Sequence, residues 1–187
     1  MKAISIFLLL CMLGFTAQAQ MVLSGVSLPV KLTHDKEELV LNGGGIRKQM
    51  LFKVYVAGLY LSAKNKNGHD ICRVDKPEAL RIQITSGLVN SKNMSQAIRE
   101  GFNQSTGGTI APLKERIEAF IHTFDKEKIS EGDIFDIWYL PGVGIKTFKN
   151  NQLKGVIQGF DFKKALFGIW LSDAPVDNRL KKALLGL

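Results

Sequence analysis

Cysteine and histidine are the side chains that most often build disulfide frameworks and transition-metal sites, and both are scarce in this 187-residue sequence. The cysteines are Cys11 and Cys72, and the three histidines, His34, His69 and His122, lie far apart, without the short spacings of metal-ligand pairs. The sequence therefore predicts no metal centre and no cofactor. We interpret Cys72 as a small core residue, because no histidine can be argued to activate it.

Long apolar runs are also missing after the first residues of the chain. Lys2 is followed by an apolar run over residues 4–15, which is too short to span a bilayer, and Ala17-Gln18-Ala19 matches a small-x-small cleavage site. We interpret residues 1–19 as a signal peptide and residues 20–187 as one mature domain that begins at Gln20. The predicted location is the bacterial periplasm or the exterior, and a retained membrane anchor is the alternative.

Acidic residues are outnumbered, since 17 Asp and Glu face 25 Lys and Arg, for a formal net charge of +8. The charge falls to +7 when Lys2 leaves with the signal peptide. A basic chain can bind nucleic acid or anionic surfaces, but these lysines are scattered and are typical of solvated helix faces. The sequence does not favour a nucleic-acid partner.

Proline is absent from Gly43 to Leu61, the stretch around which we organise the fold. This stretch runs from three glycines through β-branched and aromatic residues and predicts one long strand, or two joined at a bend, in an antiparallel sheet. Because side chains in a strand alternate, Arg47 and Tyr55 would share one face with aliphatic residues, while the other face carries core residues alone. A face of this mixed kind is typical of a sheet that closes over a cavity with one polar end.

The three glycines at the start of that stretch suggest a turn. Asn42-Gly43 is a favourable hairpin dipeptide, so we expect the chain to reverse there. The Gly-Lys-Ser/Thr sequence of a phosphate-binding loop is missing after these glycines, and no helical pattern follows them. The glycines therefore predict a turn and no nucleotide site.

The remaining sequence predicts a mixture of strands and helices in one domain. Alternating apolar residues indicate strands over 79–85, 133–140, 145–148 and 152–157, a looser pattern indicates a strand near a sheet edge over 22–32, and residues 39–41 indicate a short strand. Apolar residues at helical spacing indicate helices that begin at Asn93, near Pro112 and near Asp177, and another over 162–170. Asn150-Asn151 predicts a tight hairpin.

Two segments of this sequence resemble the chalcone isomerase-like family. The first is Arg47 followed by the run Leu51 to Leu61, which is similar to the signature strand of that family; the second extends from Gly155 through Trp170 to Lys181. Together they cover most of the chain after the first forty residues. The resemblance implies an α+β fold, an open-faced β-sandwich in which helices cover one face of a long antiparallel sheet, with a ligand cleft between the layers.

The resemblance also implies a ligand. In the fatty-acid-binding branch of the family, positions that match Arg47 and Tyr55 hold the carboxylate of a fatty acid. The acyl chain would then lie against apolar residues of the strand and the helices, for which the candidates are Leu51, Ala57, Met94, Ile98, Ile117 and Ile121. From the residues alone, an ion pair between Arg47 and a carboxylate of the same chain is the simpler interpretation, because an unpaired buried charge is costly.

The catalytic branch of the family cyclises chalcones, and the resemblance argues against this activity here. Its tyrosine and asparagine on the first long helix, and its threonine or serine on a late helix, correspond to Met94, Gly101 and Gly168. We expect no catalytic residues and no isomerase activity. Two alternatives remain open, namely an isomerase or lyase of unknown substrate that uses Arg47 and Tyr55, and an interaction module without a small ligand.

Overall fold

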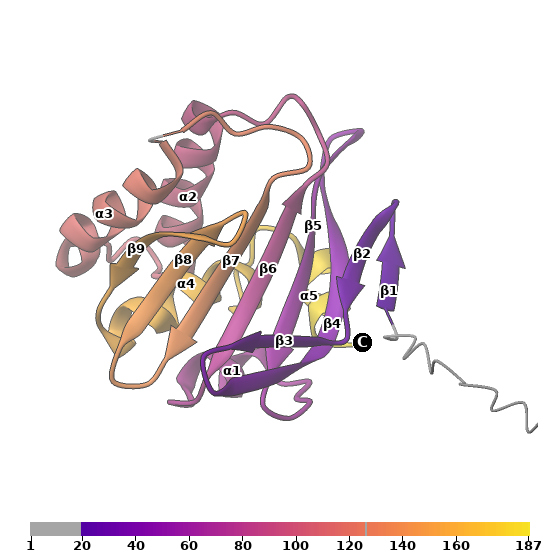
Figure 1. Cartoon of the computed structure of the whole chain (residues 1–187). Coiled ribbons are helices and arrows are strands. Elements are labelled where there is room, and N and C mark those ends of the chain that lie inside the picture. Colours follow the sequence, from indigo (N-terminus) through magenta and orange to yellow (C-terminus); the bar gives the residue numbers. More distant parts are fainter. Residues whose placement is uncertain (1–19, 126) are drawn as a thin grey trace, which may run out of the picture.

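The structure is a computed structural model that describes residues 20–125 and 127–187, and it has an α+β architecture (Figure 1). Seven strands form one antiparallel sheet in the order β3 to β9, so that each strand pairs with its neighbours in sequence. The strands of this sheet are β3 (Lys31–His34), β4 (Glu37–Gln49), β5 (Phe52–Leu61), β6 (Glu78–Ile84), β7 (Ile134–Leu140), β8 (Gly144–Lys149) and β9 (Gln152–Ile157). A separate hairpin consists of β1 (Gln20–Leu23) and β2 (Val26–Pro29).

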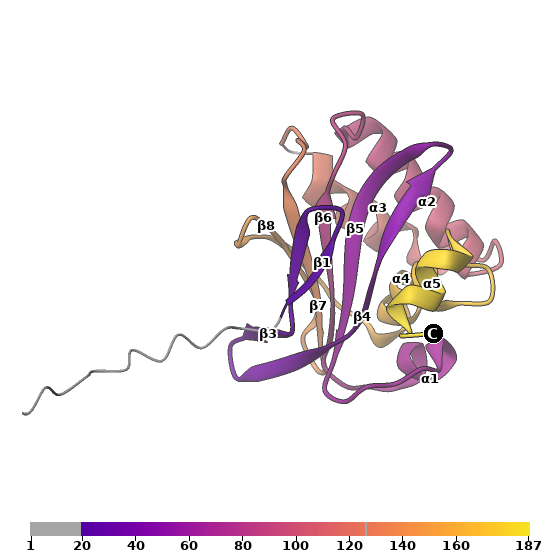
Figure 2. The ribbon, with the colours of Figure 1, turned by 90° about the vertical axis from the view of Figure 1, so that its right-hand side faces the viewer.

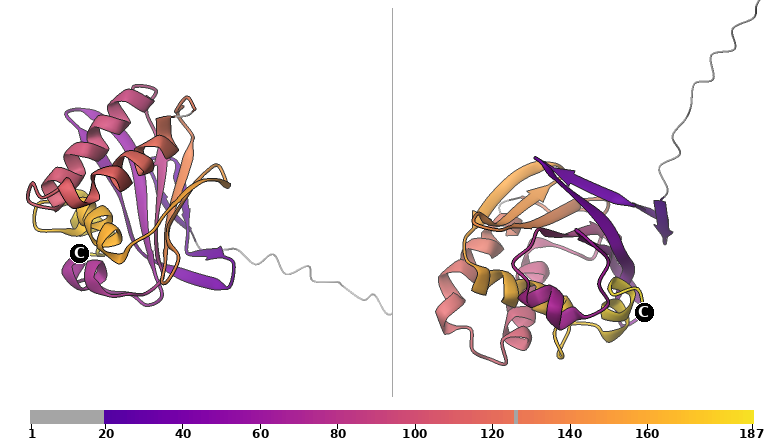
Figure 3. Two further views of the ribbon diagram at one scale, coloured as in Figure 1. Left: turned by 90° about the vertical axis from the view of Figure 1, so that its left-hand side faces the viewer. Right: turned by 90° about the horizontal axis from the view of Figure 1, so that it is seen from below.

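The helices lie together on one side of the sheet, as Figure 2 shows. They are α1 (Gly68–Arg73), α2 (Ser91–Ser105), α3 (Lys114–Asp125, preceded by a 3-10 turn at Ala111–Leu113), α4 (Phe160–Leu171) and α5 (Asn178–Leu184). The sheet curls into a half-barrel, and the two views of Figure 3 show this curvature and the grouped helices. Within the described residues, no helix combines the length and the apolar character that crossing a membrane requires.

Strand alternation divides the apolar residues into two cores on opposite faces of the sheet. In β5, Tyr55, Ala57 and Leu59 belong to the large core under the helices, whereas Val56 and Tyr60 belong to a smaller core. The smaller core lies on the other face and is partly covered by β2, whose Leu28 is fully buried in it. The period of two therefore holds in β5 from Tyr55 to Tyr60. Met50 and Phe52, which a continuous strand would place on the core face, are exposed.

The stretch Gly43 to Leu61 is a hairpin of two antiparallel strands, with its turn at Met50 and Leu51. The expected reversal at Asn42-Gly43 is wrong, because these residues lie inside β4. The glycines allow close packing instead. A Cβ atom on Gly43 would lie 2.2 Å from the carbonyl oxygen of Ala183, so α5 can lie this close to β4 only because this residue is a glycine.

Most of the other predicted elements are confirmed within one to three residues. Strands β6 to β9 and helix α4 match the expected ranges, and the Asn150-Asn151 turn has positive φ at both residues. Helix α2 begins earlier than predicted, because Asn90 caps it and Asn93 is the third residue of a reciprocal capping box. The predicted signal peptide, residues 1–19, lies outside the described residues.

Candidate functional site

A cavity of about 410 Å³ lies between the sheet and the helical layer, at the end of the molecule where β4 turns into β5. Strands β4 to β7 form its floor, and α2, α3 and α4 form its roof and walls. Its volume lies within the range of roughly 300–1,000 Å³ that is usual for small-molecule sites. The cavity residues used below are Arg47, Gln49, Met50, Phe52, Tyr55, Leu88, Met94, Ile98, Phe124, Phe135 and Trp170.

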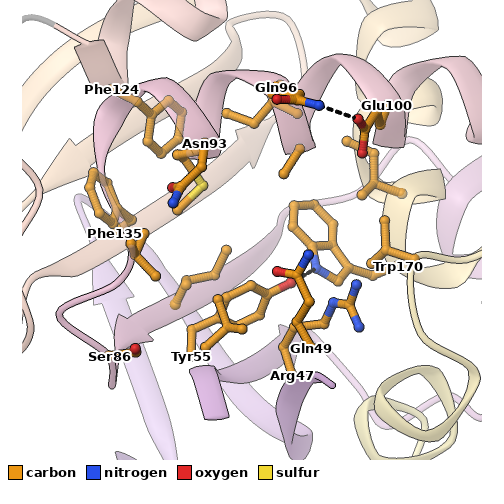
Figure 4. Close-up of a pocket in the computed structure, with 18 of the residues that line it drawn as sticks. Arg47, Gln49, Tyr55, Ser86, Asn93, Gln96, Glu100, Phe124, Phe135 and Trp170 are labelled. Carbon is orange, nitrogen blue, oxygen red and sulfur yellow. Dashed lines mark hydrogen bonds between the residues drawn. The ribbon is translucent and has the colours of Figure 1, made fainter. Parts of the chain in front are cut away.

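Arg47 and Tyr55 meet at one end of this cavity, as Figure 4 shows. The prediction that they share a face is confirmed, but its reasoning was wrong. The chain reverses between them and the register of the pairing shifts after Arg47, so their even spacing in one strand is irrelevant. They share a face because they are direct cross-strand partners, whose side chains project on the same side of the sheet.

The guanidinium group of Arg47 forms hydrogen bonds to the described chain through one of its three nitrogen atoms. Its Nη1 donates to the carbonyl oxygen of Lys48 at 2.6 Å and to Oδ2 of Asp177 at 3.2 Å, and its side chain is 25% exposed. The Nε and Nη2 atoms of Arg47 donate no hydrogen bond to the residues that the structure describes. The ion pair expected from the residues alone therefore exists, and it leaves part of the guanidinium free beside the cavity.

Asp177 has a second role, as the N-cap of α5. Its Oδ1 atom accepts hydrogen bonds from the backbone N–H groups of Arg179 and Leu180 at 2.8 and 3.1 Å. Although burial opposes ionisation, these hydrogen bonds and the nearby Arg47 lower the pKa of Asp177. The ion pair thus connects the polar end of the cavity to the start of the last helix.

Tyr55 is fixed by Trp170 of α4, whose Nε1 donates to the Tyr55 hydroxyl oxygen at 2.9 Å. Burial raises the pKa of Tyr55 to about 12, so the phenol keeps its proton at neutral pH. That proton is donated to no acceptor among the described residues. Since a phenol both accepts and donates, the bond from Trp170 orients a hydroxyl whose donor remains available to a ligand.

The other end of the cavity has two aromatic rings beside the amide of Asn93. Figure 4 shows Phe124 and Phe135 on the side away from Arg47, and both side chains are almost fully buried. Phe124 belongs to the predicted apolar stripe of the second helix, and Phe135 to an alternating strand. The sequence patterns place these residues in a helix and a strand, and only their position at the edge of an unfilled volume makes them cavity residues.

The structure brings together half of the predicted binding residues. Arg47, Tyr55, Met94 and Ile98 line the cavity. Ala57, Ile117 and Ile121 are buried in the large core without lining it. Leu51 lies at the hairpin turn and is 96% exposed, because the chain reverses where a continuous strand would have kept it on the sheet.

The structure also shows where the three positions lie that correspond to catalytic residues of the family. Met94 lines the cavity with a thioether, whereas Gly101 and Gly168 lie where α2 and α4 touch. A Cβ atom on Gly101 would come within 2.8 Å of Ile169, and one on Gly168 within 3.1 Å of Ser105. The glycines at these positions allow the two helices to approach closely. Among the described residues, no group of three or more His, Cys, Asp or Glu is placed to hold a metal ion.

Comparison with known proteins agrees with this architecture. Among solved structures, a fatty-acid binding protein of Arabidopsis thaliana matches with a TM-score of 0.71 and 18% sequence identity, over 89% of this chain and 96% of the plant chain. No curated protein matches in sequence. The family model described as chalcone isomerase-like matches residues 20–186, which is nearly the whole described chain. This protein therefore belongs to the chalcone isomerase-like family.

Proposed function

We propose that this protein is a non-catalytic carrier that binds a fatty acid, or a similar apolar carboxylate, in the cavity between the sheet and the helices. One observation carries the proposal: Arg47 and Tyr55 are cross-strand neighbours at one end of the cavity, and both have hydrogen-bond donors that the described chain does not use. The plant fatty-acid binding protein of the same fold supports the choice of ligand.

A carboxylate suits this pair of donors. Arginine presents a planar fork that matches two carboxylate oxygens, and hydrogen bonds to charged groups are roughly twice as strong as neutral ones. The ligand would accept from the free Nη2 or Nε of Arg47 and from the Tyr55 hydroxyl. Asp177 would keep Arg47 in place from the other side through Nη1.

The acyl chain would extend from this polar end toward Phe124 and Phe135, along Met94 and Ile98 of α2. Each methylene that leaves water contributes about 0.8 kcal/mol, so chain burial supplies most of the affinity. The carboxylate sets the orientation of the ligand, and the cavity length sets the upper limit on chain length.

The absence of a catalytic role is part of the proposal. The positions of Gly101 and Gly168 deliver no hydroxyl or amide group to the cavity, and Met94 has no proton to donate. Tyr55, with its pKa raised to about 12, holds its proton firmly. An isomerase or lyase that uses Arg47 and Tyr55 remains the alternative, and incubation with a chalcone tests it. We expect the chalcone absorbance to fall no faster with the protein than without it.

Export completes the proposal, with residues 1–19 acting as a leader peptide and the mature carrier working outside the cytoplasm. N-terminal sequencing of the protein recovered from the periplasm or medium tests this part. A mature chain that begins at Gln20 supports it, and an uncleaved chain recovered with the cytoplasmic fraction contradicts it.

The decisive experiment measures fatty-acid binding by delipidated protein, using isothermal titration with a saturated fatty acid and with its methyl ester. We expect the acid to bind and the ester to bind at least tenfold more weakly, because the ester lacks the charge that Arg47 recognises. Arg47→Ala should lose this preference. Arg179→Ala is the matched control, since Arg179 is an exposed arginine on α5 that does not line the cavity.

Two outcomes would reject the carrier proposal. One is a delipidated wild-type protein that takes up no fatty acid of any length. The other is equal binding of acid and ester by the wild-type protein and by Arg47→Ala, which would mean that the cavity holds apolar molecules without recognising a carboxylate.

A further inference from the structure

The tip of the β4–β5 hairpin has a composition that the folded chain does not explain. Its two turn residues, Met50 and Leu51, are 91% and 96% exposed, and Phe52 beside them is 57% exposed. Single exposed apolar residues are ordinary, but three consecutive ones at a protruding turn are not. Figures 1 and 2 show this hairpin at one end of the molecule, beside the loop that joins β6 to α2.

The backbone of the tip is unusual as well. Gln49 pairs with Phe52, so Met50 is the first of two turn residues, and its φ is +54°. Glycine or asparagine is strongly preferred where a turn needs positive φ, because other side chains are strained there. A methionine at this position weakens the hairpin and places an apolar side chain in solvent.

The charges of the tip are unfavourable for a sheet. Lys48 and Lys53 are direct cross-strand partners, and two like charges opposite each other destabilise a sheet. Both lysines are exposed, and neither forms an ion pair with the residues that the structure describes. The hairpin thus presents three apolar side chains flanked by two uncompensated positive charges.

The tip is also next to the entrance of the cavity. Met50 and Phe52 line the cavity although they are exposed, and so does Leu88 of the β6–α2 loop, which is 61% exposed. Whatever covers the tip therefore also lies against the cavity entrance. Features that cost stability and have no partner in the fold are expected at functional sites.

We propose that the β4–β5 tip, Lys48 to Lys53, docks on an anionic lipid surface. Met50, Leu51 and Phe52 would enter the boundary between headgroups and acyl chains, while Lys48 and Lys53 would pair with lipid phosphates. This combination of an apolar insertion and flanking cations is how proteins bind the interface of an anionic bilayer. Docking in this orientation turns the cavity entrance toward the lipid. The proposal does not depend on the identity of the cavity ligand.

Co-sedimentation with vesicles tests the proposal directly. The full mature protein is mixed with phosphatidylglycerol vesicles and, separately, with phosphatidylcholine vesicles. We expect binding to phosphatidylglycerol that weakens as salt is added, and at least tenfold weaker binding to phosphatidylcholine. Lys48→Gln combined with Lys53→Gln should weaken the binding to phosphatidylglycerol by roughly thirtyfold, since each lysine near an anionic surface contributes about 1 kcal/mol.

Met50→Asn separates docking from folding. Asparagine tolerates positive φ, so this variant should unfold at a higher temperature than the wild type while it binds vesicles several-fold less. Leu51→Ser should weaken the binding to phosphatidylglycerol vesicles more than tenfold. The matched controls are Leu153→Ser, at an exposed apolar residue of edge strand β9, and Lys64→Gln with Lys66→Gln, at exposed lysines beyond the opposite end of β5. These controls should bind as the wild type does.

Several results would overturn the proposal. Vesicle binding that is absent, or that is equally affected by the tip variants and the controls, removes it. A concentration-dependent dimer that Leu51→Ser dissociates, without vesicle binding, would identify the tip as an interface between two copies. The variant Lys48→Gln with Lys53→Gln should still bind a fatty acid as the wild type does, because neither lysine lines the cavity, so a failure of docking is distinguishable from a failure of the carrier proposal.

Discussion

Two cations lie under the helical layer, and they are held in opposite ways. Lys163 of α4 is fully buried, and its three donors are all used: Nζ donates to the carbonyl oxygens of Ile71, Cys72 and Val74 at 2.7–3.1 Å. The carboxyl group of Glu78, whose pKa burial raises to about 8, lies 3.1 Å away. Arg47, in contrast, uses one of its three nitrogen atoms and borders a cavity.

The difference separates a structural cation from a binding one. Lys163 joins α1 to α4 and has no capacity left for another molecule. Arg47 has spare donors, partial exposure and an adjacent hollow, all of which a ligand carboxylate requires. If burial were the only criterion, Lys163 would be chosen as the ligand-binding cation. Unused hydrogen-bonding capacity is therefore the better indicator of a ligand-binding site.

The largest effect is expected from Lys163→Met, which should lower the free energy of unfolding by about 3–5 kcal/mol, because it removes a fully buried cation and its three hydrogen bonds from groups that stay buried. It leaves three carbonyl groups without their donor and removes the cation beside Glu78. Urea unfolding followed by circular dichroism measures the change. Adding Glu78→Met should restore part of the loss, and an unchanged unfolding midpoint in the single variant would show that Lys163 is not structural.

Arg47→Ala should show the opposite profile, with a large effect on binding and a small one on stability. We expect fatty-acid affinity to fall by roughly 10- to 150-fold, which corresponds to about 1.5–3 kcal/mol for hydrogen bonds to a charged group. Because the ion pair with Asp177 is partly exposed, stability should change by about 1 kcal/mol or less. Isothermal titration and urea unfolding of the same sample measure both. A loss of stability as large as that of Lys163→Met would remove the distinction between the two cations.

Tyr55→Phe should lie between these extremes. The variant removes one donor to the ligand, for a loss of about 1 kcal/mol or roughly fivefold in affinity. It also leaves the indole N–H of Trp170 without its acceptor, which should destabilise the fold by about 1–3 kcal/mol. Titration with a fatty acid and thermal unfolding measure the two effects. Trp170→Phe is the control that removes the indole donor and keeps the phenol.

The smallest effect concerns pH. Burial raises the pKa of all three tyrosines, that of Tyr55 to about 12, whereas an unfolded tyrosine titrates near pH 10. The stability from the neutral phenols is therefore fully present below about pH 10 and is lost as the pH rises toward 12. Phenolate absorbance should stay low at pH 10 in folded protein. An increase at pH 10 without unfolding would contradict the burial of these hydroxyl groups.

The sequence predicted the two-layer architecture and most of its elements, because alternation and helical stripes are local signals that burial of one face imposes. It did not predict the hairpin turn, because the two turn residues, Met50 and Leu51, are not of the types that usually form turns. It also misread the three glycines of β4, which permit contact with α5, a segment about 140 residues later in the chain. Long-range contacts of this kind leave no local pattern.

Arg47 and Tyr55 were thus identifiable from the sequence as a pair of unusual residues in a predicted sheet, together with Met94 and Ile98 on a helical stripe. Only the tertiary structure decided which apolar residues face the cavity and which fill the core, since both kinds share the same stripes. It also decided that Arg47 pairs with Asp177 and still has free donors. A side chain's composition and spacing specify what it can bind, but the packing of distant elements determines which of its groups remain unsatisfied.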